Sequence, residues 1–182
     1  PIYNELLSAG AVMGSYGGWE RADWFTENES LKKPAASYDR QHWFDDVAQE
    51  CENVSKNCGL IDLTGFSRFE ISGDGASQWL ETMITGNLPK IGKVGLVYFS
   101  SPQGKVLTEM TATRISENNI WLLTGAGAYW HDRDWLYFNL PKNTDINIED
   151  TTHNLGTILL TGPKSDLLLS KLTKEKLDKI NF

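Results

Sequence analysis

Two kinds of hydrophobic spacing alternate along the chain, and together they predict a mixture of helices and strands. Apolar residues three or four positions apart predict a short helix over Tyr3, Leu6 and Leu7, and longer helices at 43–57, 76–85, 128–140 and 163–173. Alternating or continuous apolar runs predict strands within 59–73 and at 94–100, 105–115, 120–125, 145–152 and 156–162. Because helices are inserted between runs of strands, the pattern predicts the α+β class.

Two of these segments share a plan of a strand, a glycine, a small turn and an amphipathic helix. They are FEISGDGASQWLETMI (69–84) and ILLTGPKSDLLLSKL (158–172). We interpret the pair as two similar layers around one sheet core, as in a duplicated split-βαβ domain. Chance similarity between two strand-to-helix junctions is the alternative, since the sequence contains only two copies.

Glycine and cysteine each lead to a local prediction. GAVMGSYGGWERADWF, residues 10–25, matches neither a phosphate-binding loop nor a dinucleotide fingerprint, and we interpret it as a flexible connection. Gly59 follows the helix at 43–57, where a left-handed cap is expected.

An apolar stripe at helical spacing includes both cysteines and predicts buried free thiols; it consists of Val47, Cys51, Val54 and Cys58. We predict no metal site, because the three histidines have no Cys or carboxylate neighbours at ligand spacing.

Composition narrows the class of protein and of partner. The chain has 182 residues, of which 40% are hydrophobic, enough for one good core or for one complete domain plus part of another. The net charge is −7 and the basic residues are scattered, which argues against a nucleic-acid partner. No apolar run approaches the roughly 20 residues needed to cross a bilayer, and the start of the chain lacks the pattern of a signal peptide. We therefore expect no membrane association and a cytoplasmic or matrix-type location. Most of the seven Trp residues are expected to serve in core or interface packing.

The strand at 106–115 carries the main candidate for chemistry, Glu109. Alternation along this strand places Glu109 on the same face as Leu107 and Ile115. A carboxylate on such a face lies either at the polar rim of the sheet or against a cationic or N–H group of a ligand. In the second case it would position a ligand and stabilise positive charge without an activated nucleophile.

Several longer segments resemble the folate-binding domain of dimethylglycine and sarcosine dehydrogenases, which is related to the glycine-cleavage T-protein. Residues 10–25 resemble the junction segment of these dehydrogenases, where a Gly-rich run leads into Gly-Trp-Glu-Arg and a Trp-Phe pair. GLIDLTGFSRFEISGDGASQWLETMITGNLPKIGKV is similar to the opening of the folate domain. QGKVLTEMTATRISENNIWLLTGAGAYWHDRDWL is similar to its central stretch, and LTGPKSDLLLSKLT to a later Gly-Pro-x-Ser helix. The segments occur in order and span nearly the whole chain.

This resemblance implies an organisation and a site. Residues 1–42 would be a junction segment with a Gly-rich loop, and residues 43–182 the N-terminal part of an aminomethyltransferase-like folate-binding domain with duplicated split-βαβ layers around mixed or antiparallel sheets. In the family a strand acid contacts tetrahydrofolate near the nitrogens that take up the one-carbon unit. Glu109 matches that position, although T-proteins usually carry Asp there. Other residues match the family's cofactor-binding regions: Leu96 and Tyr98 the region lining the pterin pocket, Thr124 and Gly125 the loop after the following strand.

The implied function is tetrahydrofolate-dependent one-carbon transfer, with Glu109 as the catalytic residue. A flavin-dependent dehydrogenase domain would oxidise a methylated amine, and the folate domain would capture the one-carbon unit. FAD would belong to an upstream domain that this sequence lacks, as it lacks the rest of the folate domain, so the chain is expected to be inactive alone. One alternative is a stand-alone, non-catalytic module with this fold. Another is a glycine-cleavage T-protein or a different folate-dependent demethylase, which the junction segment disfavours.

Overall fold

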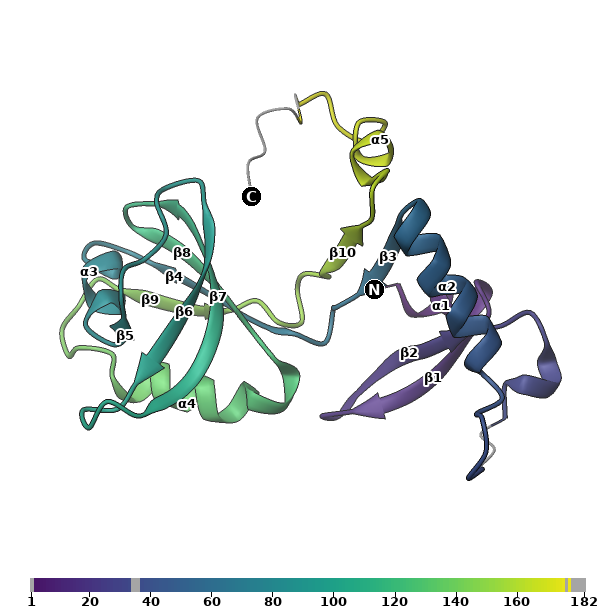
Figure 1. Cartoon of the computed structure of the whole chain (residues 1–182). Helices are drawn as coiled ribbons and strands as arrows, with labels where there is room; N and C mark the ends of the chain where they lie inside the picture. Colours follow the sequence, from purple (N-terminus) through teal and green to yellow (C-terminus); the bar gives the residue numbers. More distant parts are fainter. Residues whose placement is uncertain (1, 34–36, 176, 178–182) are drawn as a thin grey trace. The chain divides into compact units, whose positions relative to one another are not determined.

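Residues 2–33, 37–175 and 177 are described by the computed structural model of the protein (Figure 1). Internal contacts group them into two units. The first unit contains the described residues of 1–15, 20–63 and 157–182. The second, which we call the sheet unit, contains Tyr16–Trp19 and Thr64–Gly156.

The Gly-rich segment near the start of the chain forms a β-hairpin, so the prediction of a flexible connection was wrong. The predicted short helix α1 (Tyr3–Ser8) comes first, and strand β1 (Ala11–Tyr16) then pairs with β2 (Trp19–Phe25). The loop between the strands is Gly17 and Gly18, whose φ angles are 59° and 85°. A two-residue hairpin turn of type I′ has positive φ at both positions, and glycine supplies it without steric cost. The glycines therefore fix a turn.

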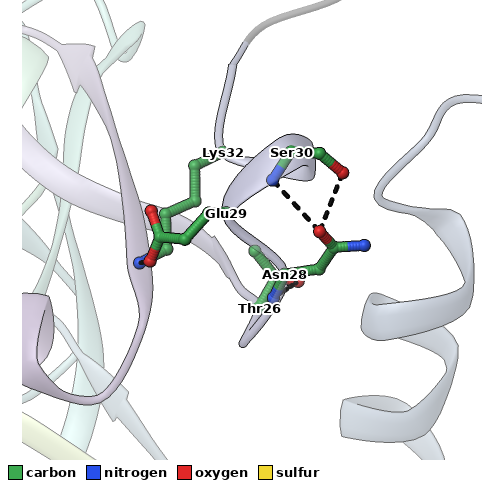
Figure 2. A network of polar contacts seen from close by, with 5 residues as sticks. All are labelled: Thr26, Asn28, Glu29, Ser30 and Lys32. Atoms are coloured by element: carbon green, nitrogen blue, oxygen red, sulfur yellow. Dashed lines mark hydrogen bonds and ion pairs between the residues drawn. The ribbon is translucent and has the colours of Figure 1, made fainter.

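A small polar network follows β2 where the chain leaves the hairpin (Figure 2). Asn28 precedes the short 3-10 helix η1 (Glu29–Leu31). Its Oδ1 accepts hydrogen bonds from the backbone N–H of Ser30 at 3.0 Å and from Ser30 Oγ at 2.7 Å. The backbone N–H of Asn28 itself donates to Thr26 Oγ1 at 3.2 Å. The side chain of Asn28 thus caps the first turn of η1 by satisfying a donor that a helix start leaves unpaired.

The helix that carries the cysteine stripe is confirmed, but the details around it differ from the prediction. Helix α2 spans Phe44–Lys56 and contains no fully buried residue. Cys51 is exposed and Cys58 half-buried, and both are free thiols, so the prediction of buried thiols was wrong. Gly59 is not a left-handed cap; it begins strand β3 (Gly59–Asp62). A Cβ there would lie 2.6 Å from Val54 Cγ2, so close packing against α2 explains the glycine.

The repeated strand–glycine–helix plan is present once in each unit. In the sheet unit, β4 (Ser67–Ser72) leads into α3 (Ala76–Glu81). In the first unit, β10 (Ile158–Thr161), which pairs antiparallel with β3, leads into α5 (Ser165–Leu169). The amide three residues after the glycine donates to the glycine carbonyl in both copies, at 3.2 Å for Gly73 and 3.1 Å for Gly162. The similarity between the two sequence segments therefore reflects the same local structure.

The sheet unit is built on antiparallel strands, which confirms the predicted α+β class. In the described part of the chain, six strands pair in the order β5-β6-β7-β8-β4-β9. Besides β4, they are β5 (Ile84–Thr85), β6 (Val94–Ser100), β7 (Val106–Ser116), β8 (Asn119–Thr124) and β9 (Asn147–Asp150). The helix predicted at 76–85 ends earlier than expected, because its last residues form β5. Helix α4 (Tyr129–Phe138) follows a short 3-10 turn, η2 (Ala126–Ala128).

The hydrophobic core of the sheet unit lies between one face of the sheet and helices α3 and α4, which are drawn beside it in Figure 1. Leu80 of α3 and Leu136 of α4 are completely buried there. They pack with inward-facing strand residues, among them Phe69, Ile71, Phe99, Met110, Ile120 and Leu122. Since side chains alternate along a strand, the remaining strand residues point to the opposite face, which no helix of the sheet unit covers in the described residues.

Candidate functional site

The uncovered face of the sheet carries three of the residues that the sequence singles out. Leu96 and Tyr98 lie on β6 and Glu109 lies on β7. The residues next to them, Val97 and Met110, are almost fully buried in the core. Alternation therefore directs the three side chains away from the core. We call this surface the open face; by strand register it consists of Leu96, Tyr98, Glu109, Thr111, Thr113, Trp121 and Leu123.

Tyr98 interacts with the carboxylate of Glu109. The two residues lie directly opposite each other on β6 and β7, the spacing at which cross-strand side chains interact. The phenol donates a hydrogen bond to Glu109, and this bond raises the pKa of Tyr98; the nearby negative charge adds to the effect. A carboxylate accepts several hydrogen bonds at once. Glu109 is exposed, so acceptor positions not used by Tyr98 are accessible to a ligand.

A β-bulge at Leu107 lies two residues before Glu109. The register of β6 and β7 pairs Phe99 with Thr108 but Ser100 with Val106, so Leu107 is an extra residue on β7. A bulge bends its strand and changes where the following side chains point. This is the reason that Val106 is exposed although simple alternation groups it with the buried Met110.

Thr124 and Gly125 are not brought together with the side chain of Glu109. Thr124 ends β8 on the core face, where it is 3% exposed. Its hydroxyl donates to Asp132 Oδ2 at 2.6 Å. Gly125 leaves the strand for η2, and a Cβ added to it would meet nothing within 4 Å. Only the backbone of this loop, and not the Thr124 side chain, is available for contacts with a ligand.

Trp121 lies on the open face and is not among the site residues that the sequence predicts. It is 44% exposed, and it shares its face with Leu123 on β8. The alternation in NIWLLT contained the signal, because Ile120 and Leu122 are the buried residues of this strand. Together with Leu96 and Tyr98, Trp121 contributes apolar surface to the open face beside Glu109. Glu70 of β4 lies opposite Trp121 and is a second carboxylate on this face.

A separate pocket of about 380 Å³ lies within the sheet unit and contains none of the predicted site residues. Its walls are aromatic and glycine-rich: Gly17, Gly18, Trp19, Ala126, Gly127, Tyr129, Trp130, Thr152 and His153. Trp19 stacks on His153 with ring centroids 5.3 Å apart, and Trp130 is 68% exposed. Gly125, which the sequence predicts to bind the cofactor, immediately precedes Ala126, one of the residues that line this pocket.

Next to this pocket, Asp150 accepts hydrogen bonds from Tyr129 and Thr152. The Tyr129 hydroxyl lies 2.6 Å from Oδ2 and the Thr152 N–H lies 3.0 Å from Oδ1. Burial by itself raises the pKa of Asp150, but these hydrogen bonds, with the nearby His153, lower it below its ordinary value. The hydrogen bond that Tyr129 donates to Asp150 also raises the pKa of Tyr129.

We expect Asp150 to make stability depend on pH in the acid range. Because its pKa is lower in the folded chain than in the unfolded chain, the stabilisation is present above the unfolded value of about 4 and is lost as the pH falls through the folded value. Unfolding by denaturant at a series of pH values should show a smaller acid-induced loss in Asp150→Asn than in the wild type. Tyr129→Phe removes one donor and should have an intermediate effect. Equal losses in all three proteins would contradict the assignment.

The described residues contain neither a metal-binding cluster nor a membrane-spanning helix. No group of three or more His, Cys, Asp or Glu residues there is arranged to hold a metal ion. No helix among those residues is both long and apolar enough to pass through a bilayer.

Comparison with known proteins identifies relatives of this chain. The family model described as the GCVT N-terminal domain matches residues 2–182. Mitochondrial dimethylglycine dehydrogenase of Rattus norvegicus is 31% identical over 174 residues, which is 95% of this chain and 20% of the dehydrogenase. The chain thus spans about a fifth of that relative. Aminomethyltransferase of Chloroherpeton thalassium is 28% identical over 149 residues, covering 81% of this chain and 41% of the transferase.

A solved structure has the same fold. The glycine cleavage system aminomethyltransferase T from Bartonella henselae aligns with 100% of this chain and 45% of its own, with a TM-score of 0.76 and 19% sequence identity. At this identity the likeness concerns the fold, while the family model matches nearly every residue. The chain therefore belongs to the GCVT N-terminal domain family.

Proposed function

We propose that this chain forms the part of a tetrahydrofolate-binding domain that receives a one-carbon unit derived from a methylated amine. The observation that carries the proposal is the exposed Glu109 carboxylate, which interacts with Tyr98 on a sheet face that also presents Leu96 and Trp121. Family membership supports this kind of chemistry. The chain matches a dimethylglycine dehydrogenase over 95% of its length, including the hairpin segment, and an aminomethyltransferase over 81%. This difference favours an arrangement in which an FAD-containing dehydrogenase domain acts on the amine.

The residues present fit such a ligand. Tetrahydrofolate, when bound, supplies the nitrogen atoms that accept the one-carbon unit. Leu96 and Trp121 offer apolar surface for a flat ring, and Glu109 offers a charged acceptor for an N–H group. The same carboxylate stabilises a positively charged nitrogen. Because Tyr98 already restricts Glu109, less side-chain freedom is lost when a ligand binds. Gly125 would contribute backbone only.

Substitution of Glu109 tests the proposal. A hydrogen bond to a charged group contributes about 1.5–3 kcal/mol, so Glu109→Gln should weaken tetrahydrofolate binding by roughly 10–100-fold. Titration calorimetry on the protein that carries this chain measures the effect. Glu109→Asp, which keeps the charge on a shorter side chain, should lie between Gln and the wild type. Glu81→Gln, an exposed carboxylate on α3, is the matched control and should bind as the wild type does.

Two outcomes would count against the proposal. If the wild type binds no tetrahydrofolate, the cofactor assignment is wrong. If Glu109→Gln binds as tightly as the wild type, the open face is not the site. A turnover assay distinguishes the catalytic from the non-catalytic alternative. A protein that binds tetrahydrofolate but forms no one-carbon derivative of it with dimethylglycine, sarcosine or an aminomethyl donor is a binding module.

A further inference from the structure

A fully buried carboxylate lies on the core side of the sheet, below the candidate site. Asp132 is in the first turn of α4 and has no exposed surface. Leu136, one turn later, is equally buried, so this side of α4 faces the sheet. Asp132 Oδ2 accepts hydrogen bonds from Thr108 Oγ1 at 3.1 Å and from Thr124 Oγ1 at 2.6 Å. His131 Nδ1 lies 2.8 Å from the other oxygen, Oδ1.

Both hydroxyl groups come from positions next to the candidate site. Thr108 immediately precedes Glu109 on β7, and Thr124 immediately precedes Gly125 at the end of β8. One carboxylate oxygen therefore joins the two strands that carry the acid and the glycine loop. The energetic cost of burying a charge is high, so this link depends on the donors being in place.

At Thr108 and Glu109 the backbone of β7 is paired with β6 but not with β8. The pairing of β7 with β8 runs from Thr111 opposite Leu123 to Ser116 opposite Asn119, so along β7 it begins only two residues after Glu109. On the other side of β7, the bulge at Leu107 interrupts the pairing with β6 just before Thr108. A bulge leaves the local ladder disrupted and the strand free to bend. On the β8 side, the Thr108–Asp132–Thr124 link thus connects the two strands by side-chain hydrogen bonds where their backbone pairing is absent.

We propose that Asp132 is a positioning residue for the candidate site: through Thr108 and Thr124 it fixes the direction of Glu109 and the start of the Gly125 loop from the opposite side of the sheet. Asp132 does not contact the ligand. The inference rests on the proposed function for the identity of the ligand, but the link between the strands is independent of it.

Substitutions of Thr108 and Thr124 test this role while Asp132 itself is left unchanged. Thr108→Val and Thr124→Val keep the volume and remove the donor, while Thr108→Ser and Thr124→Ser keep the donor. At a temperature where every variant is fully folded, each Val variant should raise the KM for tetrahydrofolate about tenfold, and each Ser variant should restore it to within about twofold. Ser77→Ala is the control, because it removes a buried hydroxyl that donates to the Glu117 carbonyl, away from the site.

A purely structural role predicts a different result. In that case the Val variants would lose stability as Ser77→Ala does, and their KM would stay at the wild-type value, which would overturn the proposal. Amide hydrogen exchange gives a readout that does not depend on folate. The Val variants and Asp132→Asn should exchange faster than the wild type at Glu109, Met110 and Ala126. If the wild type binds no folate but this acceleration is seen, the proposed function fails and the link stands; unchanged exchange refutes the link.

Discussion

Replacement of Gly73 by Ala should cost about 3 kcal/mol or more of the free energy of unfolding. Gly73 has a φ of 108°, which is unfavourable for any residue with a Cβ. The added Cβ would also lie 2.1 Å from the backbone oxygen of Asp145, a contact that side-chain motion cannot relieve. Strain and overpacking each contribute about 1–3 kcal/mol. For a chain of this size the melting temperature should fall by roughly 6–12 °C, which thermal unfolding followed by circular dichroism measures.

The variant Gly75→Ala separates backbone strain from overpacking as causes of the lost stability. Gly75 also has a positive φ, of 80°, but a Cβ there would meet nothing within 4 Å. This variant should therefore lose only the conformational part, roughly 1 kcal/mol. Equal losses at both positions would mean that the close approach of Asp145 does not contribute.

Truncation of Leu122 should be the most damaging of the simple core substitutions on β8. Leu122 is completely buried between the sheet and the helices. Removal of a buried leucine side chain leaves a cavity and costs about 3 kcal/mol. Denaturant unfolding of Leu122→Ala measures this cost directly.

The same substitution on the other face of the sheet is the control. Leu96 is 58% exposed, and Leu96→Ala should cost less than about 1 kcal/mol. The two variants together test whether the face that carries Glu109 is uncovered. A loss at Leu96 as large as at Leu122 would mean that Leu96 is packed against another part of the protein in solution.

Much of the sheet unit could be predicted from the sequence because its strands have one buried face. The expected strand at 94–100 coincides with β6, and the alternation that places Leu96 and Tyr98 away from Val97 is a local property of the chain. The cross-strand pair of Tyr98 and Glu109 could not be predicted in this way. It depends on strand register, which the bulge at Leu107 shifts by one residue.

Asp132 shows more clearly which contacts cannot be predicted from the sequence. Its place in the first turn of a helix predicts only a favourable interaction with the helix dipole. That it is buried and accepts hydrogen bonds from Thr108 and Thr124 depends on how α4 packs on two strands distant in sequence. The hairpin at Gly17 and Gly18 was missed for another reason. Its glycines are equally compatible with a flexible linker and with a tight turn, and only the φ angles distinguish them.

The order of the strands also has a consequence for self-association in solution. Strand edges are templates on which further chains can add and polymerise, and proteins block them with short or charged strands. One end of this sheet is β5, which is only two residues long. The other is β9, whose four residues include Glu149 and Asp150. A second copy approaching β9 edge to edge would bring its own Glu149 and Asp150 against them, so electrostatic repulsion opposes fibre growth from this sheet.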